Sequence, residues 1–292
     1  MLNISLKHSH CRPLIEKMRK KLLSWQSLLL SSAGRLELAK TILNGLHLYW
    51  TGAYSLPKKT IKDVEKMIRD FLWRDTPDKH TIHHVNWNSV CCPKEEGGLG
   101  IKRISDWNSA ATSVHFWDIA ANKQSMWVKW IHSRYLKSKT IWEVEPRASS
   151  TSVWRKILAA RTWIKPKVQF IIYNGENIIL GSDPWIGGDG LWAHMGERLP
   201  LLFGPTKDTK LSKLINLGAW SKPHRWPVTF DQLWTEIAGI EICGQKIDEL
   251  IWSPSKFGNL DLKEAWKELR SRGGIAEWSD WVWQRSQVPK HS

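Results

Sequence analysis

The sequence predicts a mainly helical, α+β protein, and two patterns lead to that prediction. Apolar residues recur every three or four positions through most of roughly the first 160 residues, a spacing typical of amphipathic helices. Near residue 167 the apolar period shortens to two, which is typical of short strands. A hydrophobic content of 42% is sufficient for buried cores, and no apolar run approaches the roughly 18 residues that a membrane-spanning helix needs.

Three amphipathic helices are expected in the N-terminal part of the chain. The first begins at Pro13, since proline is favoured in the first turn of a helix. Ser32 is the candidate N-cap of the second, and the third follows Pro57, where Thr60 and Asp63 have the spacing of a capping box. The apolar faces are Leu14, Ile15, Met18, Leu22, Trp25 and Leu29; Leu36, Ala39, Leu43, Leu46 and Trp50; and Ile61, Val64, Met67 or Ile68, and Phe71.

A glycine-rich turn and further helices are predicted next. The three glycines within residues 97–100 require positive φ angles or close backbone approach. Ser105 is expected to cap the following helix, with Asp106 in its first turn. Shorter helices are predicted over residues 126–136 and 153–161.

A small β-hairpin is predicted around Asn174-Gly175, because Asn-Gly between two apolar runs is typical of a tight hairpin turn. Its strands would hold Val168, Phe170 and Ile172 on one side and Ile178 and Leu180 on the other. Residues 186–209, rich in Gly and Pro, are predicted to form a loop or boundary. Short helices joined by turns are expected over 210–252, and a short strand leading into a helix over 260–266.

The charge of the chain is basic and unevenly distributed. The formal net charge is +15, and residues 1–74 hold 14 Lys and Arg against 5 Asp and Glu. This asymmetry favours a polyanionic partner, RNA or DNA, over the alternative of an ordinary solvated helical surface.

The basic side chains of the first helices are therefore candidate nucleic-acid contacts, since Lys and Arg neutralise phosphates without reading the base sequence. Cations at a helix N-terminus oppose the helix dipole, so Lys58 and Lys59 indicate a nearby anion rather than helix stability. The chain also holds 21 Trp, but Trp25, Trp50 and Trp73 follow the apolar spacing and are interpreted as core residues. The candidate contacts are Lys17, Lys20, Lys21, Arg35, Lys58, Lys59, Lys62 and Lys66.

No catalytic centre is predicted. Asp75 and Asp78 form the closest carboxylate pair, but they are interpreted as a solvated turn beside Pro77, and Asp183 as a turn residue. Adjacent side chains do not converge easily on one zinc ion, so no metal site is assigned to His83, His84, Cys91 and Cys92. Neither a serine nucleophile motif nor a phosphate-binding loop is found, and no cofactor is expected.

A set of short motifs, collinear over nearly the whole chain, resembles the region that follows the polymerase core in plant LINE-type non-LTR retrotransposon reverse transcriptases. The early motifs are Leu22-Leu23-Ser24-Trp25, Leu30-Ser31-Ser32-Ala33-Gly34-Arg35, Tyr49-Trp50, Leu56-Pro57-Lys58-Lys59 and Phe71-Leu72-Trp73. The later ones are Trp87, Val90-Cys91, Pro93-Lys94, Glu96-Gly97-Gly98-Leu99-Gly100-Ile101, Trp127-Val128-Lys129-Trp130, Tyr135-Leu136, Trp154-Arg155-Lys156-Ile157-Leu158, Asn174-Gly175, Asp183-Pro184-Trp185, Asp248, Ile251-Trp252, Gly258 and Ala265-Trp266. Gly181 departs from the family pattern, which commonly has a bulky aromatic residue there, and this departure puts the packing of the hairpin in doubt.

The resemblance implies four segments. They are a thumb-like basic helical bundle over 1–76, a helical connector with the glycine turn over 77–162, the β-hairpin and loop over 163–209, and a short α/β segment over 210–292 that leads to a truncated zinc-binding domain. The thumb would grip a template–primer duplex, and the polymerase palm, with its catalytic aspartates, would be the intramolecular partner that this sequence lacks. The expected function is that of a non-catalytic fragment of an RNA-directed DNA polymerase. A structural or protein-interaction module and a transposon relic without function are the alternatives.

The expected location is intracellular, in the nucleus or cytoplasm, without membrane association. Residues 1–13 include basic side chains and lack an apolar segment, so they do not resemble a secretory signal. Four cysteines, two of them adjacent, do not indicate a disulfide framework.

Overall fold

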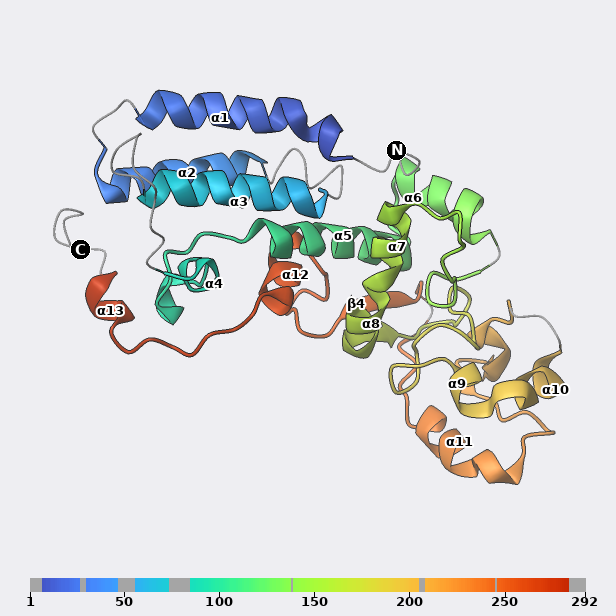
Figure 1. Cartoon of the computed structure of the whole chain (residues 1–292). Helices are drawn as coiled ribbons and strands as arrows, with labels where there is room; N and C mark the ends of the chain where they lie inside the picture. Colours follow the sequence, from blue (N-terminus) through green and yellow to red (C-terminus); the bar gives the residue numbers. More distant parts are fainter. Residues whose placement is uncertain are drawn as a thin grey trace. The chain divides into compact units, whose positions relative to one another are not determined.

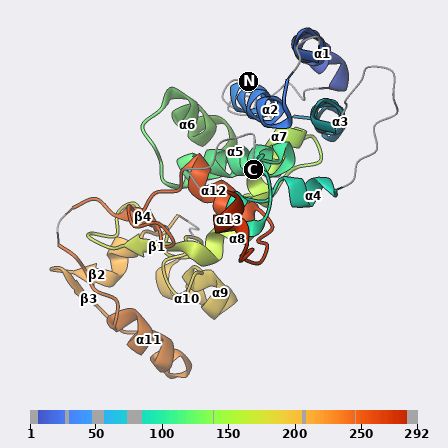
Figure 2. The same cartoon turned by 90° about the vertical axis from the view of Figure 1, so that its left-hand side faces the viewer.

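The computed structural model describes residues 7–26, 30–46, 56–73, 85–137, 139–204, 208–244 and 246–283 (Figures 1 and 2). It divides into two compact units. The first unit comprises Met1–Thr112 and Leu262–Ser292, and the second unit comprises Ser113–Asp261. The predicted predominance of helices is confirmed.

Three long helices form the main part of the first unit. They are α1 (Arg12–Gln26), α2 (Ser32–Leu46) and α3 (Lys58–Trp73), and a 3₁₀ helix (His8–Cys11) leads into α1. The three helices lie side by side (Figures 1 and 2), with α3 in contact with both α1 and α2. The predicted apolar faces are confirmed for the described side chains, and Ile68 rather than Met67 is the fully buried residue of α3.

The third helix begins directly after Pro57, as predicted, but the predicted cap residues are wrong. Ser31, not Ser32, caps α2, because its Oγ accepts a hydrogen bond from the Gly34 N–H at 3.2 Å. Thr60 lies inside the first turn of α3, where it is buried and its Oγ1 is 3.1 Å from Nδ1 of His8. A capping box requires Thr60 to precede the helix, so none forms there.

Ser105 also lies inside its helix, α5 (Ile104–Ala120), although Asp106 is in the first turn as predicted. The partner of the α5 N-terminus comes from another helix. Glu65 of α3 accepts a hydrogen bond from the Ile104 N–H at 3.2 Å. Burial raises the pKa of the Glu65 carboxyl, against the opposing effect of nearby Arg103.

The glycine turn behaves as predicted. It follows α4 (Trp87–Val90) and a 3₁₀ helix (Lys94–Glu96), and Gly97 and Gly100 have φ angles of +80° and +70°. A Cβ atom on Gly98 would lie 2.1 Å from the carbonyl oxygen of Cys92, so only glycine fits there.

The end of the described chain packs against this turn. It contains α12 (Leu262–Leu269) and α13 (Ser279–Val282). Arg270 forms two hydrogen bonds with the Glu96 carboxylate, at 2.6 and 2.9 Å, and the Gly273 N–H donates to the same group at 2.8 Å. Bonding to Arg270 lowers the pKa of Glu96. The predicted strand before α12 does not form. Residues 259–261 belong to no strand in the described structure.

The second unit combines short helices with two small antiparallel sheets. Its helices, after the end of α5, are α6 (Met126–Ile131) with a π-helical turn (His132–Leu136), α7 (Ser152–Ala159), α8 (Arg161–Ile164), α9 (Leu191–Met195), α10 (Leu199–Phe203) and α11 (Asp231–Ala238). One sheet pairs β1 (Val168–Ile171) with β4 (Glu249–Trp252), and the other pairs β2 (Ile215–Asn216) with β3 (Ala219–Trp220). The segment 186–209, predicted as a loop or boundary, contains the helices α9 and α10, joined by a 3₁₀ helix (Gly196–Arg198).

The predicted hairpin is wrong. Strand β1 exists, but Val168 pairs with Trp252 and Ile171 with Glu249, more than 70 residues away along the chain. Ile178 and Leu180 are instead fully buried in the core of this unit.

The Asn174-Gly175 turn is held by a carboxylate instead of by a strand pair. Asp248 accepts hydrogen bonds from the backbone N–H groups of Tyr173, Asn174 and Gly175 at 2.8–3.1 Å, and a fourth, to its other oxygen, from Asn177 at 3.1 Å. Four backbone donors on one charged group satisfy the turn without a neighbouring strand.

Among the described tryptophans, eight are buried in the cores: Trp87, Trp107, Trp117, Trp142, Trp154, Trp185, Trp226 and Trp252. Trp25 and Trp73 pack against the core of the first unit, whereas Trp50 is outside the described residues. Trp117 and Trp163 each contact the fully buried Trp252 edge to face. Among the helices that the structure describes, none is long and apolar enough to cross a membrane.

Candidate nucleic-acid interface

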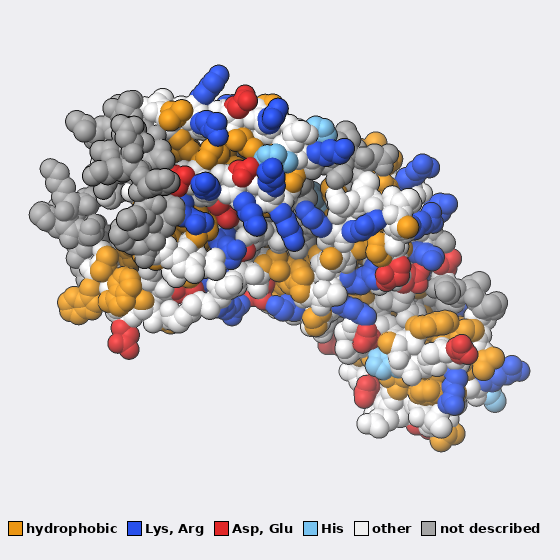
Figure 3. Space-filling view, in the orientation of Figure 1, with side chains coloured by type: hydrophobic (Ala, Val, Ile, Leu, Met, Phe, Trp, Pro, Cys, Tyr) orange, Lys and Arg blue, Asp and Glu red, His pale blue; other side chains and the backbone are white. Residues whose placement is uncertain are grey.

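The predicted contact lysines lie on the solvent-facing sides of two adjacent helices. The buried face of α1 presents Leu14, Met18 and Leu22 to the core. On α1 and α3, the side chains that point away from the core are exposed. Figure 3 shows Lys and Arg gathered over these two helices. We call this set the lysine surface: Lys17, Lys20 and Lys21 on α1, and Lys58, Lys59, Lys62 and Lys66 on α3.

These cations have few counterions. Within the described residues, no ion pair joins any member of the lysine surface to a carboxylate, and Lys21 instead lies over the ring of Trp25 at 5.4 Å. Two of the three carboxylates of α3 have other partners: Asp63 is 3.5 Å from Nε2 of His8, and Glu65 binds the start of α5. The surface therefore carries a net positive charge in an aqueous environment.

The start of α3 is electrostatically unfavourable for the helix itself. Lys58 and Lys59 occupy its first turn, which contains no acidic residue. The helix dipole places positive partial charge at this end, so two added cations repel it. A bound anion would be stabilised by the same arrangement, since the dipole and both ammonium groups attract it.

Arg35, the remaining predicted contact, differs from the lysines. It lies on α2, is half-buried, and already interacts with other residues. We therefore leave it outside the lysine surface.

A polar groove beside α3 contains basic residues that the sequence reasoning missed. It has a volume of about 610 Å³ and is lined by Lys62, Glu65, Arg69, Val85, Asn86, Trp87, Asn88 and Arg103. The sequence could have identified Arg69 as a candidate contact. It lies seven residues after Lys62 and three after Lys66, which places it on the same side of the helix. Arg103 could not have been identified in this way, because the glycine turn that brings it to the groove has no periodic signal.

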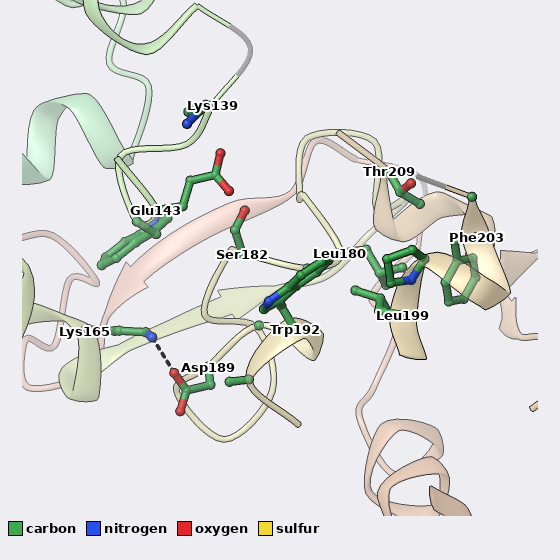
Figure 4. Close-up of a pocket in the computed structure, with 16 residues that line it drawn as sticks. Lys139, Glu143, Lys165, Leu180, Ser182, Asp189, Trp192, Leu199, Phe203 and Thr209 are labelled. Atoms are coloured by element: carbon green, nitrogen blue, oxygen red, sulfur yellow. Dashed lines mark hydrogen bonds and ion pairs between the residues drawn. The ribbon is translucent and has the colours of Figure 1, made fainter. Parts of the chain in front are cut away.

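The second unit holds a separate, more apolar pocket of about 370 Å³ (Figure 4). Trp192, Leu199 and Phe203 form an apolar wall, and the ion pair between Lys165 and Asp189 lies at its edge. Glu143 and Ser182 also line the pocket, so it combines an apolar wall with charged and polar groups. Gly181 also lines this pocket, and a Cβ atom there would lie 3.3 Å from Cδ2 of Leu199.

Asp183, interpreted from the sequence as a turn residue, does shape the backbone. Its carboxylate accepts from the Ile179 N–H at 2.7 Å, and its own N–H donates to the Ile179 carbonyl at 3.1 Å. The side chain is almost fully buried, and burial raises its pKa to about 7.

The other residues considered for chemistry are only partly described. Asp75, Asp78, His83 and His84 lie outside the described residues. Cys91 is buried, and burial raises the pKa of its thiol, which lowers its reactivity. Cys92 donates to the carbonyl of Asn88 at 3.4 Å. Among the described residues, no three His, Cys, Asp or Glu side chains gather in a way that could hold a metal ion.

In comparisons with known proteins, the chain is similar in sequence to two proteins of Arabidopsis thaliana. It is 27% identical over 295 residues to "Putative ribonuclease H protein At1g65750", an alignment that covers 95% of this chain and 46% of the relative. It is 24% identical over 142 residues to "Uncharacterized mitochondrial protein AtMg00310", covering 48% of this chain and 92% of the relative. No protein-family model and no solved structure matches the chain. The chain thus spans less than half the length of the first of these relatives.

Proposed function

We propose that the chain is a non-catalytic segment of a retrotransposon-derived protein, and that its lysine surface binds a template–primer duplex. The observation that carries the proposal is the cluster of exposed cations on α1 and α3, for which the described residues provide no ion-pair partner. Each lysine that contacts a phosphate releases a condensed counterion, which supplies affinity without base recognition.

The position of the cations supports a phosphate partner over a diffuse solubilising charge. Lys58 and Lys59 oppose the dipole of their own helix, an arrangement that costs stability unless an anion is bound. Lysines that served only solubility would serve it equally well in the last turn of α3. There the helix dipole would attract them instead of repelling them.

The resemblance to the thumb region of LINE-type reverse transcriptases supports the same role. In that family a polymerase palm supplies the catalytic aspartates, so we propose a palm domain as the protein partner and no reaction for this chain itself. The name of the Arabidopsis relative refers to a ribonuclease H, another protein class that acts on nucleic acid, and the alignment covers 46% of that protein.

A charge-reversal experiment tests the proposal. Lys17, Lys20, Lys21, Lys58, Lys59 and Lys62 are changed to Glu in the full chain, and the Kd for an RNA–DNA primer–template duplex is measured by fluorescence anisotropy. We expect a loss of affinity of at least about 100-fold, because six phosphate contacts become repulsive. The control changes exposed lysines outside these helices, Lys129, Lys213 and Lys256, to Glu, and we expect it to lose far less.

Equal binding by the charge-reversed and wild-type proteins would contradict the proposal. It would favour the alternative, a protein-interaction module. One observation supports that alternative: Ile275, Trp278 and Trp281 are 83%, 51% and 74% exposed near the end of the described chain. Clustered exposed apolar side chains mark protein-binding surfaces.

A further inference from the structure

We infer that the polar groove beside α3 is a phosphate-binding site. In it, Arg69 and Arg103 bind one backbone phosphate of the nucleic-acid strand that crosses the lysine surface. The inference rests on the proposed function and adds to it a defined anchoring point. None of the residues concerned, apart from Lys62, belongs to the lysine surface.

The charge of the groove is suited to an anion. Three cations, Lys62, Arg69 and Arg103, line it against one carboxylate, Glu65. That carboxylate is already bonded to the Ile104 N–H at 3.2 Å, and burial raises its pKa. A phosphate in the groove would therefore be surrounded by a net positive charge. The one carboxylate in the lining, that of Glu65, is already bonded to a backbone N–H group.

The two arginines have unused hydrogen-bonding capacity. Their Nε atoms are buried and have no hydrogen-bond partner in the described structure. The central carbon of the Arg69 guanidinium lies 5.3 Å from the centroid of the Trp87 ring, within the range of a cation–π contact. Arg103 reaches Asp106 only at 4.0 Å, the limit of an ion pair.

The ligand class follows from the donors. A guanidinium presents parallel N–H groups that match two oxygens of one phosphate, and two guanidinium groups provide a site more specific than point charges. The side chains of Asn86 and Asn88 also line the groove. The Oδ1 atom of Asn86 is occupied as the cap of α4, where it accepts from the Asn88 N–H at 3.0 Å, so its amide NH₂ is the group left for a ligand oxygen.

Lys62 connects the groove with the lysine surface. It is exposed on α3 and lines the groove as well. A strand lying across α3 thus passes from lysines, which bind phosphates as point charges, to arginines, which fix one phosphate in place. The groove would set the register of the backbone, and the lysines would supply most of the affinity.

The test compares Arg69→Lys with Arg103→Lys, and both with the double variant Arg69→Gln/Arg103→Gln, in the full chain. The Lys variants keep the charge and lose the planar fork. We expect each to weaken binding of a short RNA–DNA hybrid duplex several-fold while the salt dependence stays unchanged, because the charge count is the same. The double Gln variant is expected to weaken binding at least about tenfold and to reduce the salt slope by about one, because the two arginines share one phosphate.

Side-chain NMR provides a second measurement that does not depend on the stability of the variants. The Nε–Hε signals of Arg69 and Arg103, assigned from the single Lys variants, are expected to shift when the hybrid duplex is added to wild-type protein. If both signals stay in place and the double Gln variant binds as wild type, while charge reversal of the lysine surface abolishes binding, the groove inference is wrong and the proposed function stands. If charge reversal also has no effect, both are wrong.

Discussion

At the scale of single residues, Asp183 shows how a buried carboxylate couples the fold to pH. Its side chain bonds to the Ile179 N–H, but burial dominates and raises its pKa from 3.8 to about 7. The folded state therefore prefers the protonated acid more than the unfolded state does. This contribution to stability is present below about pH 4 and is lost as the pH rises towards 7.

Replacement of Asp183 by Asn should remove this pH dependence, because the amide keeps a hydrogen-bond acceptor and does not ionise. We expect the unfolding free energy of Asp183→Asn, relative to wild type, to increase between pH 4 and pH 7, by at most about 1.4 kcal/mol per pH unit. Urea unfolding of both proteins across that range measures the difference. A difference that is constant with pH would show that Asp183 ionises normally in the folded protein.

The sequence identified the wrong cap residue at three helix starts. Ser32, Thr60 and Ser105 have the chemistry of helix caps, yet each lies within its helix. The start of α5 is bonded by Glu65, 39 positions earlier. Local patterns identify residues that can cap a helix, but they do not include a carboxylate supplied by a neighbouring helix.

At the scale of elements, the amphipathic helices were the most predictable part of the fold. The spacing of apolar residues on α1 and α3 fixes which face is buried, and it thereby places the lysines on the opposite face. The strand at residues 168–171 was also predictable, but its pairing was not. Asn-Gly predicts a local turn, and the structure keeps that turn while β1 pairs with β4 and Asp248 bonds the turn backbone.

The N-terminus of α3 gives a prediction in which stability and binding change in opposite directions. Changing Lys58 and Lys59 to Glu should stabilise the helix by about 0.3–1 kcal/mol per residue, because the negative charges complement the dipole. The same change should weaken duplex binding. Thermal unfolding and anisotropy on the same samples measure the two effects.

Lys66→Glu is the matched control for that variant. Lys66 is exposed on the same helix, beyond its first turn, so its replacement should weaken binding without raising the melting temperature. If Lys58→Glu/Lys59→Glu lowered the melting temperature, a stabilising role for the two lysines in the free protein would replace the anion-binding interpretation.

At the scale of the whole molecule, the account predicts that the two units differ in their contribution to binding. The first unit carries the lysine surface and the groove with Arg69 and Arg103. The second unit carries a mostly apolar pocket and exposed lysines that are dispersed over several elements. Composition alone predicted a basic N-terminal part, but the groove depends on the glycine turn, which brings Arg103 beside α3 in a way that no local pattern indicates.

The salt dependence of duplex binding tests the central claim most directly. The Kd of wild type, of Lys17→Glu/Lys20→Glu/Lys21→Glu and of the control Lys129→Glu/Lys213→Glu/Lys256→Glu is measured across a salt series with one RNA–DNA hybrid. Both triple variants have the same net charge, so only the position of the change differs. We predict a steep linear fall of log affinity with log salt for wild type and control, and a slope smaller by about three for the α1 variant. Equal slopes for the two variants, or affinity that does not respond to salt, would contradict the claim that the lysine surface binds nucleic acid.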